Sequence, residues 1–197
     1  MRVGLEDEEV VVALPGYSHV VALTRRGQVW VWGTSFNGEL GTGPMQETCP
    51  EPVLLAGFGN NQIETICCGC THSLAVDTRG RLWAWGENSS GALGLGDTLS
   101  RSEPTLMVEG KLASQGHRVV LLACSTRNSA AITNNNKLWV WGDGSFGKLP
   151  DSVDQLTPAR VCGAGLECVL AVSLHEYVVI ALCQSAPETT SYLMIWG

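Results

Sequence analysis

Three cysteines and a histidine lie close together in the sequence and have the composition of a metal site: Cys67, Cys68, Cys70 and His72. Zinc sites combine a closely spaced Cys pair with a second pair of ligands farther along the chain. Alternation along an extended strand sends the neighbours Cys67 and Cys68 to opposite faces. Cys124 recurs at the repeat position of Cys68, which is typical of a small packing residue. We therefore expect no metal and no cofactor.

Two histidines could act as acid and base, but their placement argues against catalysis. His19 and His72 occupy equivalent positions in a repeating pattern, which Asn128 and Glu176 fill later in the chain. A catalytic pair would not recur once per repeat, so we expect hydrogen bonds that stabilise turns. Neither a nucleophile elbow nor a pair of acids is evident, and we expect no enzyme.

Glycine-rich stretches at 38–43 and 91–96 could in principle hold a phosphate. A phosphate-binding loop would also need Gly-Lys-Ser/Thr between a strand and a helix, and neither stretch has it. We expect these glycines to serve turns that require positive backbone angles.

These residues recur because the whole chain repeats. Two tryptophans and a glycine alternate as Trp-x-Trp-Gly in three copies, and a weaker copy ends the chain; all seven tryptophans lie in these copies. Residues two apart in a strand share a face, so each pair predicts one aromatic layer in the core. The copies are Trp30, Trp32 and Gly33; Trp83, Trp85 and Gly86; Trp139, Trp141 and Gly142; and Trp196 with Gly197.

The elements that position these residues follow one order in each repeat. Each complete repeat has two apolar strands, the second reading His-x-Leu-Ala-Val in the second repeat. A turn, the tryptophan strand, a glycine-containing loop and a proline-containing outer strand follow. The third repeat has Asn134–Asn136 at its turn, where we expect asparagine to replace glycine because it tolerates left-handed backbone. Its loop has Pro150, and the fourth repeat stops at Gly197. We place the repeats at about 9–62, 63–118, 119–167 and 168–197. Short strands at such a period predict small sheets that pack on their neighbours.

The composite Cys-Gly-x2-His-x-Leu-Ala-Val, Trp-x-Trp-Gly and Gly-x-Leu-Gly-x-Gly closely resembles the RCC1 repeat of the regulator-of-chromosome-condensation family. The resemblance implies an all-β protein, a β-propeller of four-stranded antiparallel blades. Complete propellers of that family have about seven blades, so residues 1–197 would form one partial domain of about three and a half blades, an open arc and not a closed ring. WD40 and kelch repeats differ in their signatures.

The resemblance also implies a function. The leading hypothesis is a non-catalytic platform for protein–protein interaction, part of a larger RCC1-repeat protein or complex. Its partners would be the remaining blades, a partner chain or a small GTPase. The alternatives are a guanine-nucleotide exchange factor for a small GTPase and a chromatin-associated binding module. A plant photoreceptor family shares this fold, but its sensing tryptophans have no counterpart in Gly16–His19 or Gly69–His72.

Charge and composition limit the other classes of function. The net charge is −7 and the pI is about 5.0, so we expect no direct nucleic-acid binding, which needs a basic surface. No apolar run approaches membrane-spanning length, and the acidic stretch Glu6–Glu9 is unlike a secretory signal. Eight cysteines without an export signal favour a reducing compartment. We expect an intracellular protein, cytoplasmic or nuclear and not secreted.

Overall fold

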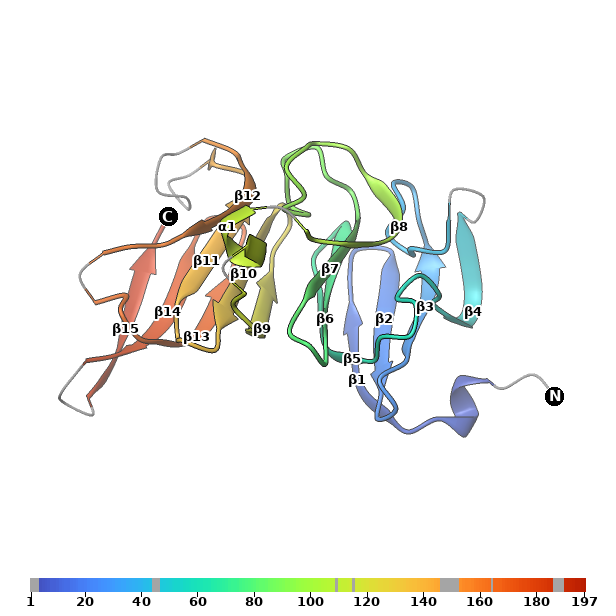
Figure 1. The fold of residues 1–197 in the computed structure, drawn as a ribbon. Coiled ribbons are helices and arrows are strands. Elements are labelled where there is room, and N and C mark those ends of the chain that lie inside the picture. The colour runs from blue at the N-terminus through green and yellow to red at the C-terminus, as the bar shows by residue number, and fades with distance from the viewer. Residues whose placement is uncertain are drawn as a thin grey trace.

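The computed structural model describes residues 4–43, 47–108, 110–114, 116–145, 153–163, 165–185 and 190–197. Four antiparallel sheets stand side by side in an open arc (Figure 1). No helix among the described residues has the length and hydropathy to span a bilayer. The expected fold class, an all-β partial propeller, is confirmed.

Each sheet is one blade, and its strands follow the chain from one edge to the other. We call the sheets blade 1 (10–54), blade 2 (63–106), blade 3 (119–160) and blade 4 (169–196). Blade 1 consists of β1 (Val10–Pro15), β2 (His19–Thr24), β3 (Val29–Thr34) and β4 (Thr48–Leu54), and blade 2 of β5 (Ile63–Cys68), β6 (His72–Asp77), β7 (Leu82–Gly86) and β8 (Arg101–Leu106). Blade 3 consists of β9 (Val119–Cys124), β10 (Asn128–Thr133), β11 (Leu138–Gly142) and β12 (Gln155–Arg160), and blade 4 of β13 (Val169–Leu174), β14 (Val179–Gln184) and β15 (Ser191–Trp196). Two short helices, η1 (Leu5–Asp7) and α1 (Gly110–Ser114), lie outside the sheets.

The hairpin turn in the middle of each of the first three blades needs one residue with left-handed backbone. Gly27 and Gly80 provide it with φ of 75° and 78°, and Asn136 provides it in blade 3 with φ of 57°. Asn136 is the only non-glycine residue with positive φ in the part of the chain that the structure describes. Asparagine tolerates this conformation better than other side chains. The expectation that asparagine replaces glycine at this turn is confirmed.

The hydrophobic core lies between the blades. The cluster between blades 1 and 2 contains Trp83 and Trp85, and the cluster between blades 2 and 3 contains Trp139 and Trp141. Phe58 packs edge-on against Trp83 and Trp85, with ring centroids 5.5 and 5.8 Å apart. Each tryptophan pair thus faces the preceding blade, and each blade is stabilised mainly by its neighbours.

The glycine that directly follows the last tryptophan of each blade lies very close to the neighbouring strand. A Cβ built on Gly33, Gly86, Gly142 or Gly197 would meet the Cα of the facing residue at 2.8, 2.8, 3.0 and 2.8 Å. The facing residues are His19, His72, Asn128 and Val178. Val178 is therefore the fourth counterpart of His19, and the assignment of Glu176 to that position is wrong. In blade 4, the position equivalent to Gly16 and Gly69 is not a glycine, and the position equivalent to His19 and His72 is not a histidine.

Candidate protein-interaction site

The second tryptophan of each complete pair is anchored on the loop of the preceding blade. Trp85 Nε1 donates a hydrogen bond to the backbone oxygen of Glu39 at 3.0 Å, and Trp141 Nε1 donates to that of Ala92 at 2.8 Å. Both acceptors lie in the glycine loops, residues 35–41 of blade 1 and 88–94 of blade 2. Each glycine loop is thus the receptor for the next blade's indole.

The glycines of these loops make room for the ring that docks there. A Cβ on Gly41 would lie 2.9 Å from Trp85 Cδ1, and one on Gly94 would lie 2.8 Å from Trp141 Nε1. Both glycines have positive φ, 71° and 72°. The expected structural role therefore has a second part, because the loop needs both the backbone angle and the missing side chain.

The two repeat histidines also join neighbouring blades. His19 Nε2 lies 3.1 Å from Ser73 Oγ, and His72 Nε2 lies 2.9 Å from Ser129 Oγ. Ser129 Oγ donates its single proton to the oxygen of Ala92 at 2.8 Å, so it must accept from His72, and the proton of that imidazole is on Nε2. The sequence suggested a bond inside each turn, whereas the rings reach across to the next blade.

Both imidazoles are held in the neutral form. His19 is 2% exposed and His72 is fully buried. Burial lowers the pKa of both, that of His72 to about 4 with a smaller effect from nearby His19. Their Nδ1 atoms have no hydrogen-bond partner among the described residues. The residues serve as buried links and not as acid–base groups at neutral pH.

Among the described residues, the histidine–serine hydrogen bond occurs between blades 1 and 2 and between blades 2 and 3, but not between blades 3 and 4. Ser73 and Ser129 face Trp85 and Trp141 in their sheets, and Val179 faces Trp196 at the same position. Valine has no hydroxyl, so the link cannot form between blades 3 and 4. Asn128 donates instead to the backbone oxygen of Asp143 at 2.7 Å, within blade 3.

The glycine loop of blade 1 is shaped by a buried carboxylate. Glu39 is 1% exposed, and its Oε2 accepts from the backbone N–H of Phe36 and Asn37 at 2.8 and 2.7 Å and from Ser35 Oγ at 3.0 Å. Burial alone would raise the pKa of Glu39, but the hydrogen bonds from Asn37 and Ser35 outweigh it and lower that pKa. The charged side chain holds the loop that receives Trp85.

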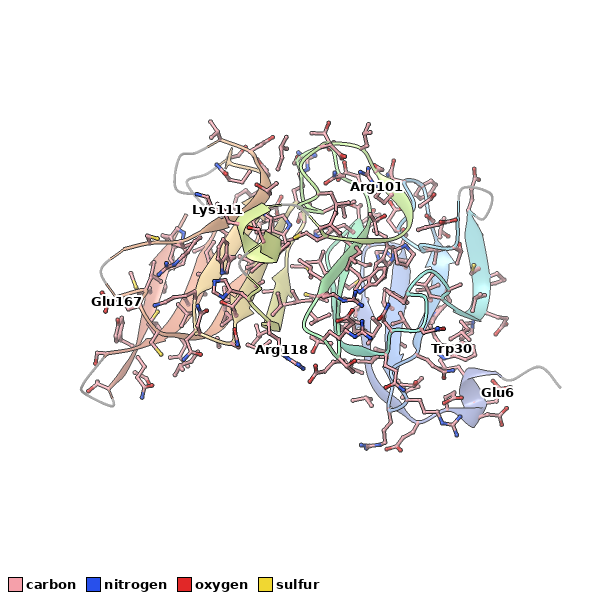
Figure 2. All side chains as sticks on the ribbon, in the orientation of Figure 1. Glu6, Trp30, Arg101, Lys111, Arg118 and Glu167 are labelled. Atoms are coloured by element: carbon pink, nitrogen blue, oxygen red, sulfur yellow. The ribbon has the colours of Figure 1, made fainter. Side chains whose placement is uncertain are left out.

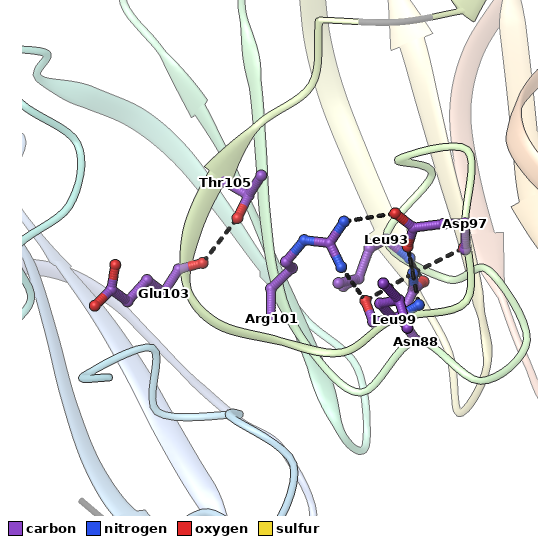
Figure 3. A network of polar contacts seen from close by, with 7 residues as sticks. All are labelled: Asn88, Leu93, Asp97, Leu99, Arg101, Glu103 and Thr105. Carbon is purple, nitrogen blue, oxygen red and sulfur yellow. Dashed lines mark hydrogen bonds and ion pairs between the residues drawn. The ribbon is translucent and has the colours of Figure 1, made fainter. Parts of the chain in front are cut away.

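In blade 2 the side-chain amide of Asn88 holds the corresponding glycine loop (Figure 3). Asn88 is fully buried; its Oδ1 accepts from Leu93 N at 2.9 Å and its Nδ2 donates to Asp97 O at 2.9 Å. Asp97 is in turn paired with Arg101 at 2.6 Å. Different side chains therefore stabilise equivalent loops, and sequence comparison of the repeats did not single out either residue.

The cysteines pack as the alternation predicts. Cys67 contacts the core between blades 2 and 3, and Cys68 contacts the core between blades 1 and 2. Burial raises the pKa of Cys68 to about 12, so that thiol is unreactive at neutral pH. Across the described part of the chain, no three His, Cys, Asp or Glu residues are grouped as metal ligands.

The first end of the arc carries an unfilled copy of the inter-blade contact. Trp32 occupies the position of Trp85 and Trp141, but it is partly exposed whereas they are fully buried. Its indole N–H has no hydrogen-bond acceptor among the described residues, because no glycine loop faces it. Trp30 is only 4% exposed and lines a cavity of about 620 Å³ together with Glu8, which follows η1. Figure 2 shows Trp30 on the same side of blade 1 as Glu6.

The other end carries exposed apolar side chains. Leu193 and Ile195 on β15 are each 64% exposed. Their counterparts Val29 and Val31 on β3 are 1% and 0% exposed, because blade 2 covers them. Within the described residues, the two ends of the arc are therefore where inter-blade surfaces lack a neighbour.

A third surface is a groove at one end of the blades. The turns that follow the inner strands of all four blades line it, and its volume is about 440 Å³. Tyr17 stands there with 85% of its surface exposed, beside Cys70, Thr126 and Glu176. This groove is the natural alternative to the arc ends as a binding surface.

The sequence matches the family pattern of the regulator of chromosome condensation (RCC1) repeat at residues 26–76 and 79–132. It matches a second pattern of the same repeat at residues 11–39, 63–92 and 119–148. The human E3 ubiquitin-protein ligase HERC2 is 35% identical over 81% of this chain and 3% of its own length. The ultraviolet-B receptor UVR8 of Arabidopsis thaliana is 34% identical over 83% of this chain and 37% of its own length. The chain thus spans a minor part of these relatives.

Solved structures agree with this assignment at the level of the fold. Human WBSCR16 superposes with a TM-score of 0.83 at 22% identity, over 95% of this chain and 47% of that protein. Prp20p of Saccharomyces cerevisiae superposes with a TM-score of 0.71 at 22% identity, over 84% of this chain and 41% of that protein. The repeat matches cover more than half of the chain and show that it belongs to the RCC1 repeat family.

Proposed function

We propose that residues 1–197 act as a non-catalytic protein-binding platform, an arc of RCC1 blades that works inside the cell within a larger protein or complex. One observation carries the proposal. Trp85 and Trp141 are each buried against a glycine loop of the preceding blade, whereas Trp32 has the same position and faces no such loop among the residues that the structure describes. The partner that fits Trp32 is a polypeptide that offers a backbone carbonyl from a loop of this kind.

The exposed side chains at both ends support the same proposal. Val10 of β1 is 41% exposed at the first end, whereas its counterparts Ile63 and Val119 are buried, and Leu193 and Ile195 are exposed at the other end. Neighbouring apolar residues at a surface usually mark interfaces, and a terminal repeat that is stable alone normally has a polar outer face. Further blades or a partner chain would cover these residues.

A small GTPase is the partner that the alternative function needs. The structure of Prp20p was described with its binding to Gsp1p and histones, and Prp20 has also been crystallised bound to Kap60. At 18 and 22% identity these likenesses extend to the fold alone. We therefore test separately whether this chain accelerates nucleotide exchange on a small GTPase.

The experiment compares two single variants of the tagged chain expressed in cells. Trp32→Ala removes the unmatched indole at the arc end, and Tyr17→Ala removes the exposed ring at the groove. Quantitative mass spectrometry of the co-purified proteins gives the stoichiometry of each partner. We expect Trp32→Ala to lose the partner that is recovered at equal stoichiometry, and Tyr17→Ala to retain it.

Two results would overturn the platform proposal. One is loss of the partner in Tyr17→Ala with full retention in Trp32→Ala, which would place binding in the groove. The other is accelerated nucleotide release from a member of a small GTPase panel, which would make the chain an exchange factor. Thermal melts of both variants control for unfolding, since neither side chain lies in an inter-blade core.

A further inference from the structure

We propose that a cavity at the junction of blades 2 and 3 binds the C-terminal residue of a partner polypeptide, with an aliphatic side chain inside it and the terminal carboxylate at Arg79. This inference rests on the proposed platform function and specifies one kind of partner. The cavity has a volume of about 280 Å³ and lies between the hairpin turn of blade 2 and α1, in the middle of the arc (Figure 1).

The floor of the cavity is apolar. Leu82, Met107, Leu112 and Val119 line it, and each of them is 5% exposed or less. All four belong to the core between blades 2 and 3, so their positions are fixed by packing. An aliphatic side chain placed on this floor would be removed from water, which favours its binding.

The rim of the cavity carries cationic side chains. Arg79 and Arg81 of the hairpin turn line it together with His117. Arg81 is paired with the buried carboxylate of Asp77 at 2.8 Å and donates to Asn61 at 2.6 Å, so its charge is already matched. Arg79 is exposed, and its guanidinium has no hydrogen-bond or ion-pair partner among the described residues. Arg79 is therefore the cation that can pair with an anion of another molecule.

The equivalent turn of blade 1 provides an internal contrast. Arg26 occupies the position of Arg79, since each directly precedes the glycine of its turn. Arg26 donates to Glu8 at 3.0 Å, and the side chain of Glu8 is 2% exposed. Blade 2 has Asn61 at the position of Glu8, and this amide is bound to Arg81. Among the described residues, the arginine at this position has a carboxylate partner in blade 1 and none in blade 2.

The surroundings of the cavity favour an anionic ligand. Lys111 on α1 forms no ion pair with a described residue. The carboxylate of Glu64 is bound by Arg118 at 2.6 Å, and Figure 2 shows Lys111 and Arg118 at this junction. The described cations therefore outnumber the described acids here, although the chain as a whole carries a net charge of −7. Such a local excess attracts groups of the opposite charge.

The size of the cavity selects the ligand. Small-molecule sites usually have volumes of about 300–1,000 Å³, so this cavity holds little more than one side chain. The apolar group and the anion must therefore lie on the same residue. In a polypeptide, an aliphatic residue at the C-terminus carries both, and capture of a terminal carboxylate is an established mode of peptide recognition. Val108 at the cavity rim is 71% exposed and would contact the preceding residue of the partner.

The test titrates residues 1–197 into a fluorescein-labelled peptide, Gly-Ser-Gly-Ser-Val-Leu, that has a free C-terminal carboxylate. We expect saturable binding at one peptide per chain. The C-terminal amide of this peptide and a version that ends in serine should each bind about tenfold less tightly, because the first lacks the charge and the second lacks the aliphatic side chain. Added salt should weaken binding, since the carboxylate pairs with an exposed guanidinium.

Two arginines at equivalent positions locate the carboxylate on the protein. Arg79→Gln should weaken binding about tenfold, and Arg26→Gln, in the matched turn of blade 1, should leave it unchanged. Ala113→Leu fills the cavity from α1, where Ala113 lines it, and should also weaken binding. Thermal melts control for unfolding, and Arg79→Gln should melt as the parent does because Arg79 is exposed.

Three outcomes would overturn this inference: no saturable binding, equal binding of the amidated peptide, or equal losses in the two arginine variants. Octanoate tests a free small acid as the ligand. Tighter binding of octanoate than of the peptide, with the same loss in Arg79→Gln, would overturn the assignment to a polypeptide. Trp32→Ala should bind the peptide as the parent does, so failure of the cavity proposal and failure of the platform proposal are distinguishable.

Discussion

Trp85 and Trp32 occupy the same position in two blades of the same fold, but their surroundings differ. Trp85 is fully buried, packs edge-on against Phe58 and donates to a carbonyl of blade 1. Trp32 is partly exposed and faces no blade among the described residues. The comparison teaches that burial at this position is a property of the pair of blades and not of the blade that carries the tryptophan.

The largest expected effect separates these two residues directly. Trp85→Ala should lower the free energy of unfolding by about 3–5 kcal/mol, because it removes a large buried ring and leaves a cavity. Trp32→Ala should cost about 1 kcal/mol or less, as is usual away from a packed core. Urea unfolding of both variants and the parent measures the difference. Equal costs at the two positions would contradict the account.

A substitution in the loop that receives Trp85 should lower the free energy of unfolding nearly as much. Glu39→Ala leaves the N–H groups of Phe36 and Asn37 and the hydroxyl of Ser35 without their acceptor, and it should cost about 2–3 kcal/mol. Glu47→Ala is the matched control, an exposed glutamate in the same connection, and should change stability by less than about 0.5 kcal/mol. A Glu39 variant as stable as the control would show that the loop keeps its shape without the carboxylate.

The buried imidazole of His72 makes the free energy of unfolding depend on pH. The folded-state pKa of His72, about 4, lies below its ordinary value of 6.5, so the unfolded chain binds more protons between these values. Stability from this group is complete above pH 6.5 and falls as the pH drops toward 4, by about 2 kcal/mol between pH 7 and pH 5. His72→Asn, which copies Asn128 of blade 3, should flatten this part of the profile. An unchanged slope in that variant would assign the pH dependence to other groups.

The smallest predicted effect concerns the hairpin turn of blade 3. Asn136→Ala should cost about 1 kcal/mol, because alanine is disfavoured at a φ of 57°. Asn136→Gly, which restores the residue found at Gly27 and Gly80, should be neutral or slightly stabilising. Thermal melts of the two variants check this order, and the reverse order would mean that the asparagine side chain, and not the backbone angle, fixes the turn.

The sequence predicts the repeated parts of this molecule well, because local rules control them. Alternation in Trp-x-Trp-Gly places both rings on one face, and the requirement for left-handed backbone explains why the asparagines of 134–136 can replace a glycine turn. The bond from His72 to Ser129 was not predictable in the same way. It joins residues on neighbouring blades, and the sequence does not specify which side chains two packed sheets bring together.

Two further features escaped sequence reasoning for physical reasons. Val178 takes the place of His19 in blade 4 through the register of its sheet, and no residue type marks that position. Glu39 and Asn88 shape equivalent loops with different chemistry, so comparison of the repeats shows no shared residue there. The third glycine loop at 146–150 and its Pro150 lie outside the described residues.

Sedimentation velocity of residues 1–197 over a range of concentrations tests the central claim, that the ends of the arc are surfaces built to be covered. We predict that the weight-average sedimentation coefficient rises with concentration into the tens of micromolar, and that Trp32→Ala reduces this association. A constant monomer value, together with a sharp thermal transition above about 60 °C, would show that the arc is self-sufficient and would contradict the account.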